Sequence, residues 1–339
     1  MKRLTVAGRL IITALILGAI FVGYKYFGGQ KALDKMAQNQ SAGADSVTVT
    51  AGYEPTPSES SSSNSDATSS ETSTFSYTSP EPVDGKLKGV VELGASGFNS
   101  FIIKVDNQKR WSLEKSEFGN SLVTENMATD EDIRIGLKKY IGSMLDFGVG
   151  SKDIHFVVSS GAAKAEVTQK ITKALKSLGY VVNQVTPEQE GQLALKSVLP
   201  TEYADKAFVV DIGSGNTKIS WIDGSKVSAL ESYGAKYFQD GKDDAKVYEE
   251  VSAKAKQVPE NLRKTCFIIG GVPFEMAKEV RKGKERYTTL SEPLAYSKLS
   301  NAKSKAGVNI YKAVKDATGC DQFVFDWDAN FTIGFLLGL

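Results

Sequence analysis

Two apolar runs that each end in a carboxylate and a glycine-rich turn dominate the hydrophobic pattern of this chain. In the second of them, the apolar residues 208–210 are followed by Asp211. The turn that comes next consists of Gly213, Ser214, Gly215 and Asn216. Residues 218–222 then alternate polar and apolar side chains, which is the period of a β-strand. The pattern predicts a hairpin with a carboxylate at its mouth, whose small turn residues let backbone N–H groups face an anion.

The first apolar run repeats this arrangement. Residues 89–106 also read as strand, acid, glycine turn and strand, with Glu92 in the place of Asp211. The first turn comprises Gly94, Ala95, Ser96 and Gly97 and, two positions further on, Asn99. Two such hairpins about 120 residues apart indicate two copies of one subdomain. A phosphate chain bound between the two turns would be held from both sides.

Other glycine motifs do not fit the second turn. A dinucleotide fingerprint requires a third glycine and a following helix, and a P-loop requires four residues between its glycines and then Gly-Lys-Ser/Thr. The chain has neither pattern at residues 211–222. An ordinary hairpin turn remains open as an alternative to an anion-binding one.

The rest of the body alternates helical and strand-like segments. Helices are predicted over residues 131–147, 163–178, 187–199, 242–256, 273–280, 308–317 and 333–339. Buried strands are predicted over residues 154–158, 180–185, 265–269 and 323–327. This alternation predicts an α/β body. Gly270 and Gly271 follow one of these strands, where they either let a ligand approach the backbone or simply turn the chain into the next helix.

The N-terminal region differs in composition from this body. Residues 10–24 are uncharged and apolar, and a segment from 10 to 27 approaches the length of a spanning helix. A cleaved signal peptide is the alternative, although no Ala-x-Ala site follows. Positive residues on the two sides of the segment nearly balance. The cluster before it slightly favours a body outside the cytoplasm, and a cytoplasmic body stays open.

Composition sets the remaining expectations. Lys plus Arg number 41 and Asp plus Glu number 40, a net charge of +1 that argues against a basic nucleic-acid binder.

The predicted organisation is a basic tail (1–9), a transmembrane anchor (10–27), a Ser-rich flexible linker (28–85), a first subdomain (86–205) and a second subdomain (206–339). The C-terminal helix of the second subdomain could return to the first.

Six short motifs occur in one order along the chain. They are Glu92-Leu-Gly-Ala-Ser-Gly-Phe98, Ser159-Ser-Gly-Ala162, Thr186-Pro-Glu-Gln-Glu-Gly-Gln-Leu193, Asp211-Ile-Gly-Ser-Gly-Asn-Thr217, Gly234-Ala-Lys-Tyr-Phe238 and Ile269-Gly-Gly271. From about Gly85 to Val280, this order resembles the exopolyphosphatase / guanosine pentaphosphate phosphohydrolase family. That family lies within the sugar kinase–Hsp70–actin superfamily. The resemblance implies two ribonuclease-H-like subdomains of the actin-like ATPase type, with a phosphate-binding cleft between them.

The resemblance also implies an activity and its residues. The activity is Mg²⁺-dependent cleavage of phosphoanhydrides, with Glu190 as the catalytic base and Glu92 and Asp211 as the metal-side acids. The two glycine turns are expected to bind phosphate, and Gly270 and Gly271 are expected to contact the ligand. A carboxylate at a helix start can orient and deprotonate an attacking water. It can equally be a helix N-terminal acid that interacts favourably with the helix dipole.

Several positions depart from the family pattern. Glu92 stands where an aspartate is usual, Gln189 replaces the first glutamate of a pair, and Lys164 is the nearest match to an arginine. Lys218 replaces an acidic residue, and its side chain is expected to point to solvent rather than to phosphate. We therefore expect a membrane-tethered hydrolase of polyphosphate or a nucleoside polyphosphate. The alternative is a catalytically degenerate phosphate or nucleotide sensor, or an actin-like assembly module.

Partners follow from the same expectations. They are a polyphosphate or nucleotide ligand, Mg²⁺, and the membrane through residues 10–27, with no nucleic acid and with a homodimer as an open option. If the body lies outside the cytoplasm, nucleotides are scarce and polyphosphate becomes the better candidate.

Overall fold

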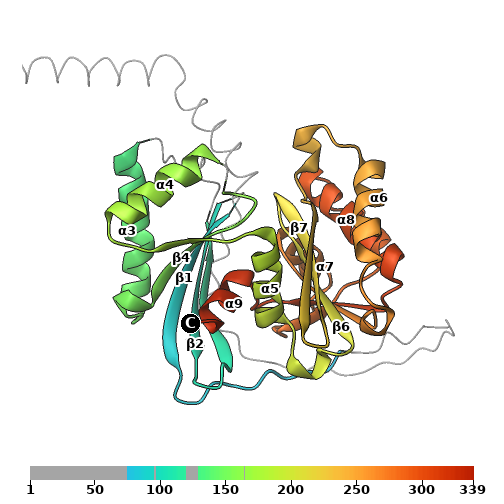
Figure 1. Cartoon of the computed structure of the whole chain (residues 1–339), viewed down its shortest axis with the longest axis horizontal. Coiled ribbons are helices and arrows are strands. Elements are labelled where there is room, and N and C mark those ends of the chain that lie inside the picture. Colours follow the sequence, from blue (N-terminus) through green and yellow to red (C-terminus); the bar gives the residue numbers. More distant parts are fainter. Residues whose placement is uncertain (1–74, 95–96, 120–128, 164) are drawn as a thin grey trace, which may run out of the picture. The chain divides into compact units, whose positions relative to one another are not determined.

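The computed structural model describes residues 75–94, 97–119, 129–163 and 165–339 of the chain. These residues belong to one compact unit, which is built from two lobes (Figure 1). Each lobe contains a mixed β-sheet with helices on its outer face, so the predicted α/β body with two related subdomains is confirmed.

Lobe I contains, within the described residues, a five-stranded sheet in the order β3-β2-β1-β4-β5. Its first three strands form an antiparallel meander, and β4 runs parallel to β1. The strands are β1 (Lys86–Gly94), β2 (Gly97–Val105), β3 (Trp111–Phe118), β4 (Ile154–Val158) and β5 (Val182–Gln184). The apolar run before Glu92 forms β1, and the glycine turn after it leads into β2 as the sequence pattern predicts.

Lobe II contains, in the same part of the chain, a six-stranded sheet in the order β10-β11-β9-β6-β7-β8. Its core repeats lobe I, because β6, β7 and β8 form an antiparallel meander and β9 runs parallel to β6. The strands are β6 (Ala207–Ile212), β7 (Asn216–Asp223), β8 (Lys226–Tyr233), β9 (Thr265–Ile269), β10 (Tyr287–Thr289) and β11 (Gln322–Asp326). The two hairpins noticed in the sequence are therefore equivalent elements of a duplicated sheet.

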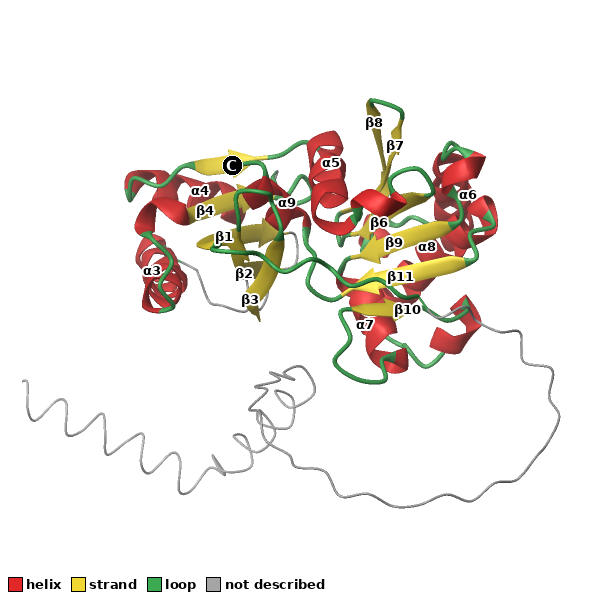
Figure 2. Ribbon diagram, turned by 90° about the horizontal axis from the view of Figure 1, so that it is seen from below, coloured by secondary structure: helices red, strands yellow, loops and turns green. Residues whose placement is uncertain are grey.

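The helices form three layers around the two sheets (Figures 1 and 2). The outer layer of lobe I consists of α3 (Asp130–Asp146) and α4 (Glu166–Ser177). The outer layer of lobe II consists of α6 (Asp244–Ala255), α7 (Gly271–Val280) and α8 (Ala302–Thr318). Between the sheets lie α5 (Pro187–Val198) and α9 (Phe331–Leu337).

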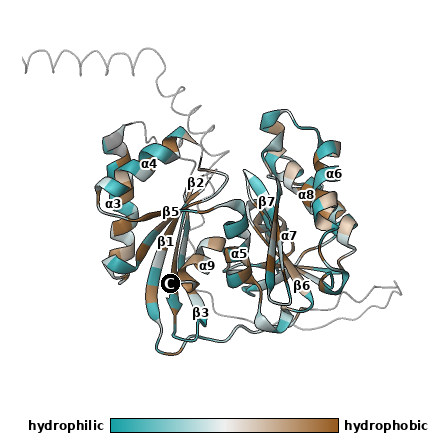
Figure 3. Ribbon diagram, viewed as in Figure 1, coloured by the Kyte–Doolittle hydropathy of each residue, from teal (hydrophilic) through white to brown (hydrophobic). Residues whose placement is uncertain are grey.

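Three apolar cores follow from this layering. One lies between sheet I and its outer helices, and another lies between sheet II and its outer helices. The third is shared, because the inner faces of both sheets pack there against α5 and α9. Apolar colouring is concentrated along the strands and on the inward sides of the helices (Figure 3). The C-terminal helix α9 packs against α5 and β1, so the end of the chain contributes to the junction of the lobes.

Some element boundaries differ from the predictions. Helix α8 begins at Ala302 rather than at 308, because Asn301 caps it by accepting a hydrogen bond from the Ser304 N–H. Its first turn is rich in lysine and serine, which hides the start in a hydrophobicity pattern. The short edge strand β10 was not predicted, since three residues give too little alternation to be recognised.

The N-terminal predictions fall mostly outside the described residues. The basic tail, the anchor over residues 10–27 and the linker up to residue 74 all lie there. Among the helices that are described, none has the length and apolar character needed to cross a membrane.

The last part of the predicted flexible linker is packed against the body. The ring of Phe75 lies 5.5 Å from that of Tyr203, 5.6 Å from Phe267 and 5.3 Å from Tyr287, measured between ring centroids. Further along, the Val83 N–H donates a hydrogen bond of 3.0 Å to Asp106, in the turn after β2. Residues 75–84 therefore connect the two lobes, because aromatic contacts outweigh the polar composition that suggested a free tether.

Candidate functional site

The two predicted carboxylates end equivalent strands and share one buried region. Glu92 lies near the end of β1 and Asp211 near the end of β6, and the two residues are 8% and 7% exposed. Burial, together with the nearby charges of Glu190 and Asp211, raises the pKa of Glu92 to about 7, although two hydrogen bonds act in the opposite direction. The structure thus brings the two hairpin acids together with Glu190. We call these three residues the carboxylate centre.

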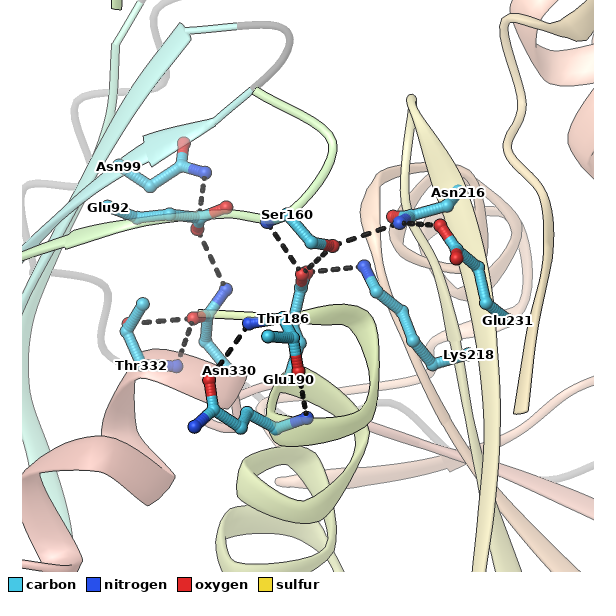
Figure 4. Close-up of polar contacts among 11 residues, drawn as sticks. Glu92, Asn99, Ser160, Thr186, Glu190, Asn216, Lys218, Glu231, Asn330 and Thr332 are labelled. Atoms are coloured by element: carbon cyan, nitrogen blue, oxygen red, sulfur yellow. Dashed lines mark hydrogen bonds and ion pairs between the residues drawn. The ribbon is translucent and has the colours of Figure 1, made fainter. Parts of the chain in front are cut away.

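Glu92 is held by two amide side chains from different parts of the chain. The Nδ2 of Asn99 donates to Glu92 Oε2 over 3.0 Å, and the Nδ2 of Asn330 donates to the same oxygen over 3.2 Å (Figure 4). Gly94 lies beside the other oxygen, since a Cβ on Gly94 would stand 3.1 Å from Glu92 Oε1. Asn330 also caps α9, so the C-terminal helix fixes the position of the lobe I carboxylate.

Glu190 is positioned by the start of α5. Thr186 caps this helix, and Gln189 completes a capping box in which its side chain accepts from the Thr186 N–H over 2.9 Å. The capping box gives Gln189 a structural role at the position where the family pattern has glutamate. Glu190 itself is 2% exposed and lies on the buried side of the helix, in its first turn.

Both oxygens of Glu190 have partners (Figure 4). The backbone N–H of Ser160 donates to Oε2 over 2.9 Å, and the Ser160 hydroxyl donates to the same oxygen. The Lys218 ammonium donates to Oε1 in a buried ion pair. Ser160 was not a predicted site residue, although the Ser159-Ser-Gly-Ala162 motif contained it.

Lys218 differs from its sequence-based expectation. It lies on β7 directly opposite Asp211 in the antiparallel register, and its side chain is 3% exposed instead of pointing to solvent. Burial raises the pKa of Asp211 to about 6, while the Lys218 charge lowers it and the Glu190 charge raises it. Two of the buried carboxylates, Glu190 and Asp211, therefore interact with the Lys218 ammonium. The sequence gives no sign of this burial, because strand alternation does not reveal which face is covered by α5.

The two lobes touch beside this centre at two glycines. A Cβ on Gly215 would stand 2.9 Å from the Cα of Gly161, and a Cβ on Gly161 would stand 3.2 Å from the Cα of Gly215. Asn216 donates through Nδ2 to the Ser160 hydroxyl over 2.9 Å and to Glu231 over 2.6 Å. The glycine turn of lobe II is thus in direct contact with the loop after β4 of lobe I.

Gly270 and Gly271 lie next to the end of β6. Gly270 has φ of 113°, and a Cβ there would stand 2.3 Å from the carbonyl oxygen of Ile212, so close packing alone requires glycine. Gly271 is exposed at the first turn of α7, where a Cβ would stand 3.3 Å from the Lys303 ammonium. The structure places both glycines near the second turn, and their assignment as ligand contacts stays a prediction.

The remaining predicted residues divide into two groups. Gly94, Gly97 and Asn99 line the first hairpin, and Gly213 lies within reach of Lys218 in the second. Ala95 and Ser96 of the first turn and Lys164 lie outside the described residues. Asn330 was missed, although an asparagine before the apolar run 331–337 is a recognisable helix cap.

The chemistry of the centre suits an anion together with a cation. In the described ranges, no group of three or more His, Cys, Asp or Glu side chains is arranged to hold a metal ion alone. The carboxylate centre is also largely closed, and a surface groove of about 570 Å³ lies elsewhere, between α4 and β5. Two buried acids can still supply part of a Mg²⁺ shell when substrate phosphates supply the rest.

Comparisons with known proteins find a phosphatase family and structures of exopolyphosphatase-like proteins. A model of the Ppx/GppA phosphatase family matches residues 121–287. A Ppx/GppA enzyme from Aquifex aeolicus is 17% identical, with a TM-score of 0.57 over 75% of this chain and 99% of that one. An exopolyphosphatase from Cytophaga hutchinsonii is 15% identical, with a TM-score of 0.57 over the same shares. No curated protein matches the chain in sequence. At such identities the two structures establish a common fold.

Proposed function

Because the chain belongs to the Ppx/GppA phosphatase family, we propose that it hydrolyses phosphoanhydrides and releases the terminal phosphate of polyphosphate or a nucleoside polyphosphate. One observation carries this proposal. Glu190, at the start of α5, is buried and interacts electrostatically with Glu92 and Asp211, the acids of the two duplicated hairpins. A general base, two acids for a cation and two backbone turns are the parts that phosphoryl transfer to water requires.

Each part has a role in the proposed reaction. Gly94 and Gly97 of the first hairpin and the turn at residues 213–215 hold the phosphate chain from opposite lobes through backbone N–H groups, apart from that of Gly213, which donates to the Asn216 carbonyl oxygen over 3.0 Å. Glu190 accepts a proton from the water that attacks the terminal phosphorus, and Ser160 fixes the carboxylate in position through two hydrogen bonds to Oε2. Positioning of this kind supplies much of the catalysis in phosphoryl transfer, because the protein contributes little covalent chemistry.

A divalent cation fits the acids of the two hairpins. Phosphatases of this family generally depend on a divalent metal, and we propose Mg²⁺ held by Glu92 and Asp211 together with substrate oxygens. Carboxylate oxygens are the ligands that Mg²⁺ prefers, and substrate phosphates often complete its coordination shell. When bound, the ion would neutralise charge that develops on the phosphate oxygens.

The predicted N-terminal anchor completes the proposal. A helix over residues 10–27 would tether the enzyme to a membrane through the Ser-rich linker, with the body outside the cytoplasm. Polyphosphate is then the more available substrate. The balance of positive charges on the two sides of residues 10–24 supports this orientation only slightly.

The experiment is phosphate release by the full-length chain. Tripolyphosphate, ATP and guanosine pentaphosphate are each supplied with Mg²⁺, and Glu190→Gln is compared with the wild type. We expect the substitution to lower turnover at least 100-fold, in line with the usual contribution of a general base. Glu188→Gln is the matched control, because Glu188 lies exposed in the same helical turn. Equal release by the wild type and Glu190→Gln would contradict the assignment of the base.

One observation favours a second function. Glu190 is already neutralised by the Lys218 ammonium, an arrangement that suits a protein that binds phosphate without cleaving it. Such a sensor would show a higher unfolding temperature with tripolyphosphate but no phosphate release in the same buffer. The same samples therefore distinguish the two functions.

A further inference from the structure

Lys218 is the only lysine or arginine of the described residues that forms an ion pair with the carboxylate centre. Its side chain is 3% exposed, and its hydrogen-bond partner is Glu190 Oε1. Burying an ammonium is costly unless an anion compensates it. The chain nevertheless buries this cation beside Glu190 and directly opposite Asp211 in the strand register.

The ammonium also lies against the glycine turn of lobe II. A Cβ on Gly213 would stand 3.6 Å from Lys218 Nζ and 2.7 Å from the carbonyl oxygen of Asn216. The glycine therefore leaves the ammonium facing the turn itself, with no side chain between them. A phosphate oxygen held by this turn would come within reach of the lysine, which is a common phosphate ligand in the form of a point charge.

Glu190 does not depend on the lysine for its position. Ser160 donates two hydrogen bonds to Oε2, while Lys218 contacts only Oε1. The carboxylate can therefore keep its place when the ammonium leaves. Lysine suits such a change of partner, because its charge is carried on a flexible four-carbon stem with three donors.

We propose that Lys218 is the phosphate-binding cation of the centre and that it moves from Glu190 to a terminal phosphate oxygen when substrate enters. This inference rests on the proposed function and names a binding and positioning residue for it. The exchange releases Oε1 of Glu190 only in the complex. The ligand class is a phosphoanhydride whose terminal phosphate lies at the turn formed by residues 213–215.

The released oxygen then has a defined use. Oε1 of Glu190 accepts a proton from water as the water oxygen bonds to the terminal phosphorus. The bond between that phosphorus and the bridging oxygen breaks, and the shortened chain leaves with the bonding electron pair. The proton on Glu190 passes to solvent when orthophosphate departs, and Lys218 returns to the carboxylate. No oxidant or further reactant is needed.

The first measurement is binding of tripolyphosphate to the full-length chain in EDTA, by titration calorimetry. Because the cation belongs to the protein, the wild type binds without metal. We expect Lys218→Met to weaken binding at least tenfold. Lys226→Met is the matched control, since Lys226 is exposed at the start of β8 in the same meander. Equal weakening in both variants, or none in Lys218→Met, would overturn the proposal.

The second measurement tests the exchange itself. If phosphate must compete with Glu190 for the ammonium, Glu190→Gln removes the competitor and tightens tripolyphosphate binding several-fold. The same substitution in a Lys218→Met background lacks that gain, so the two effects are coupled in a double-mutant cycle. An equal gain in both backgrounds would indicate only the loss of a repelling charge, and the exchange would be wrong.

The same set of variants separates effects on folding from effects on binding. Lys218→Met leaves Glu190 buried without its partner, which is a strongly destabilising change. The double variant removes both charges, so where the single variant unfolds its comparison with Glu190→Gln still measures how much Lys218 contributes to tripolyphosphate binding, and equal affinities would overturn the proposal. Binding alone decides the exchange. Absence of phosphate release would contradict the proposed hydrolase and leave the result of the cycle unaffected.

Discussion

At the scale of single residues, three buried acids lie close together in the carboxylate centre, and one of them forms an ion pair with Lys218. Glu92, Asp211 and Glu190 are each less than a tenth exposed, and Lys218 provides the only ion pair to them among the described residues. Hydrogen bonds from Asn99 and Asn330 hold Glu92 in place without cancelling its charge. Such an arrangement costs stability in the free protein and is typical of a binding site for a cation or a substrate.

The loss of folding stability caused by burying Glu92 should depend on pH. Burial raises the pKa of Glu92 to about 7, whereas an unfolded glutamate titrates near about 4.3. The folded protein therefore binds the extra proton between these values, and its stability falls as the pH rises through that window. We expect Glu92→Gln to be more stable than the wild type at pH 8 in EDTA, by on the order of 2 kcal/mol, and equally stable near pH 4.

Urea denaturation at a series of pH values in EDTA checks this expectation. The amide of the variant can still accept from Asn99 and Asn330, so geometry is largely preserved. Glu249→Gln, on an exposed position of α6, serves as the control and should follow the wild-type curve. Parallel curves for wild type and Glu92→Gln would show that Glu92 is not the group responsible.

The sequence identifies the acids of this centre but not their environment. Asp211 and Glu92 follow from the repeated hairpin pattern, and Glu190 follows from the family resemblance. Lys218 could not be placed, because the residue is buried by α5, an element that comes from elsewhere in the chain. Ser160 and Asn330 likewise contact the centre through tertiary packing that no local pattern records.

At the scale of elements, the lobe II glycine turn and the loop after β4 are the parts through which the two lobes touch beside the carboxylate centre. Gly215 of the lobe II turn and Gly161 of the loop after β4 leave no room for a side chain. This contact aligns Asn216 with Ser160, which in turn holds Glu190. The lobe II turn therefore sets the geometry of the proposed base as well as facing the proposed phosphate.

A methyl group at this contact should separate the lobes slightly. In Gly215→Ala, the new Cβ would stand 2.9 Å from the Cα of Gly161, so the backbone must shift. We expect a loss of stability on the order of 1–2 kcal/mol by urea denaturation, together with weaker tripolyphosphate binding. Gly142→Ala is the control, because nothing lies within 4 Å of its Cβ position and alanine favours a helix.

The outcome that contradicts this prediction is a Gly215→Ala protein with wild-type stability and wild-type affinity. The lobes would then tolerate the methyl group, and the glycine contact would have no role in aligning Ser160. A change in affinity without a change in stability would instead place the effect in the turn alone.

Element types were predictable where local chemistry is strong. The start of α5 followed from Thr186 as cap and Pro187 at the first helical position, and the structure confirms both. The start of α8 was missed, because its first turn is polar and only the Asn301 cap marks it. Element boundaries that depend on a single side chain are therefore the least visible in the sequence.

At the scale of the whole molecule, two copies of one sheet share a core that neither copy could bury alone. The inner faces of both sheets pack against α5 and α9. The duplication was visible as two similar hairpins, and the α/β class followed from alternating segments. The shared core was not visible, since it depends on which face each helix covers. The packing of residues 75–84 was also missed, although alternating exposure at residues 75–79 matches the sequence Phe-Ser-Tyr-Thr-Ser.

This last segment gives a prediction for the whole chain. Phe75 contacts the rings of Tyr203, Phe267 and Tyr287, and Ser79 hydrogen-bonds to Tyr287 over 2.8 Å. Because Phe75 is half-buried, Phe75→Ala should cost about 2 kcal/mol of unfolding free energy, less than for a fully buried ring. Thr78→Ala, at an exposed position of the same segment, should cost almost nothing. Relative to a chain that begins at residue 71, a chain that begins at residue 85 should lose at least as much stability as Phe75→Ala loses. Equal urea midpoints for these two shortened chains would show that residues 75–84 do not stabilise the body.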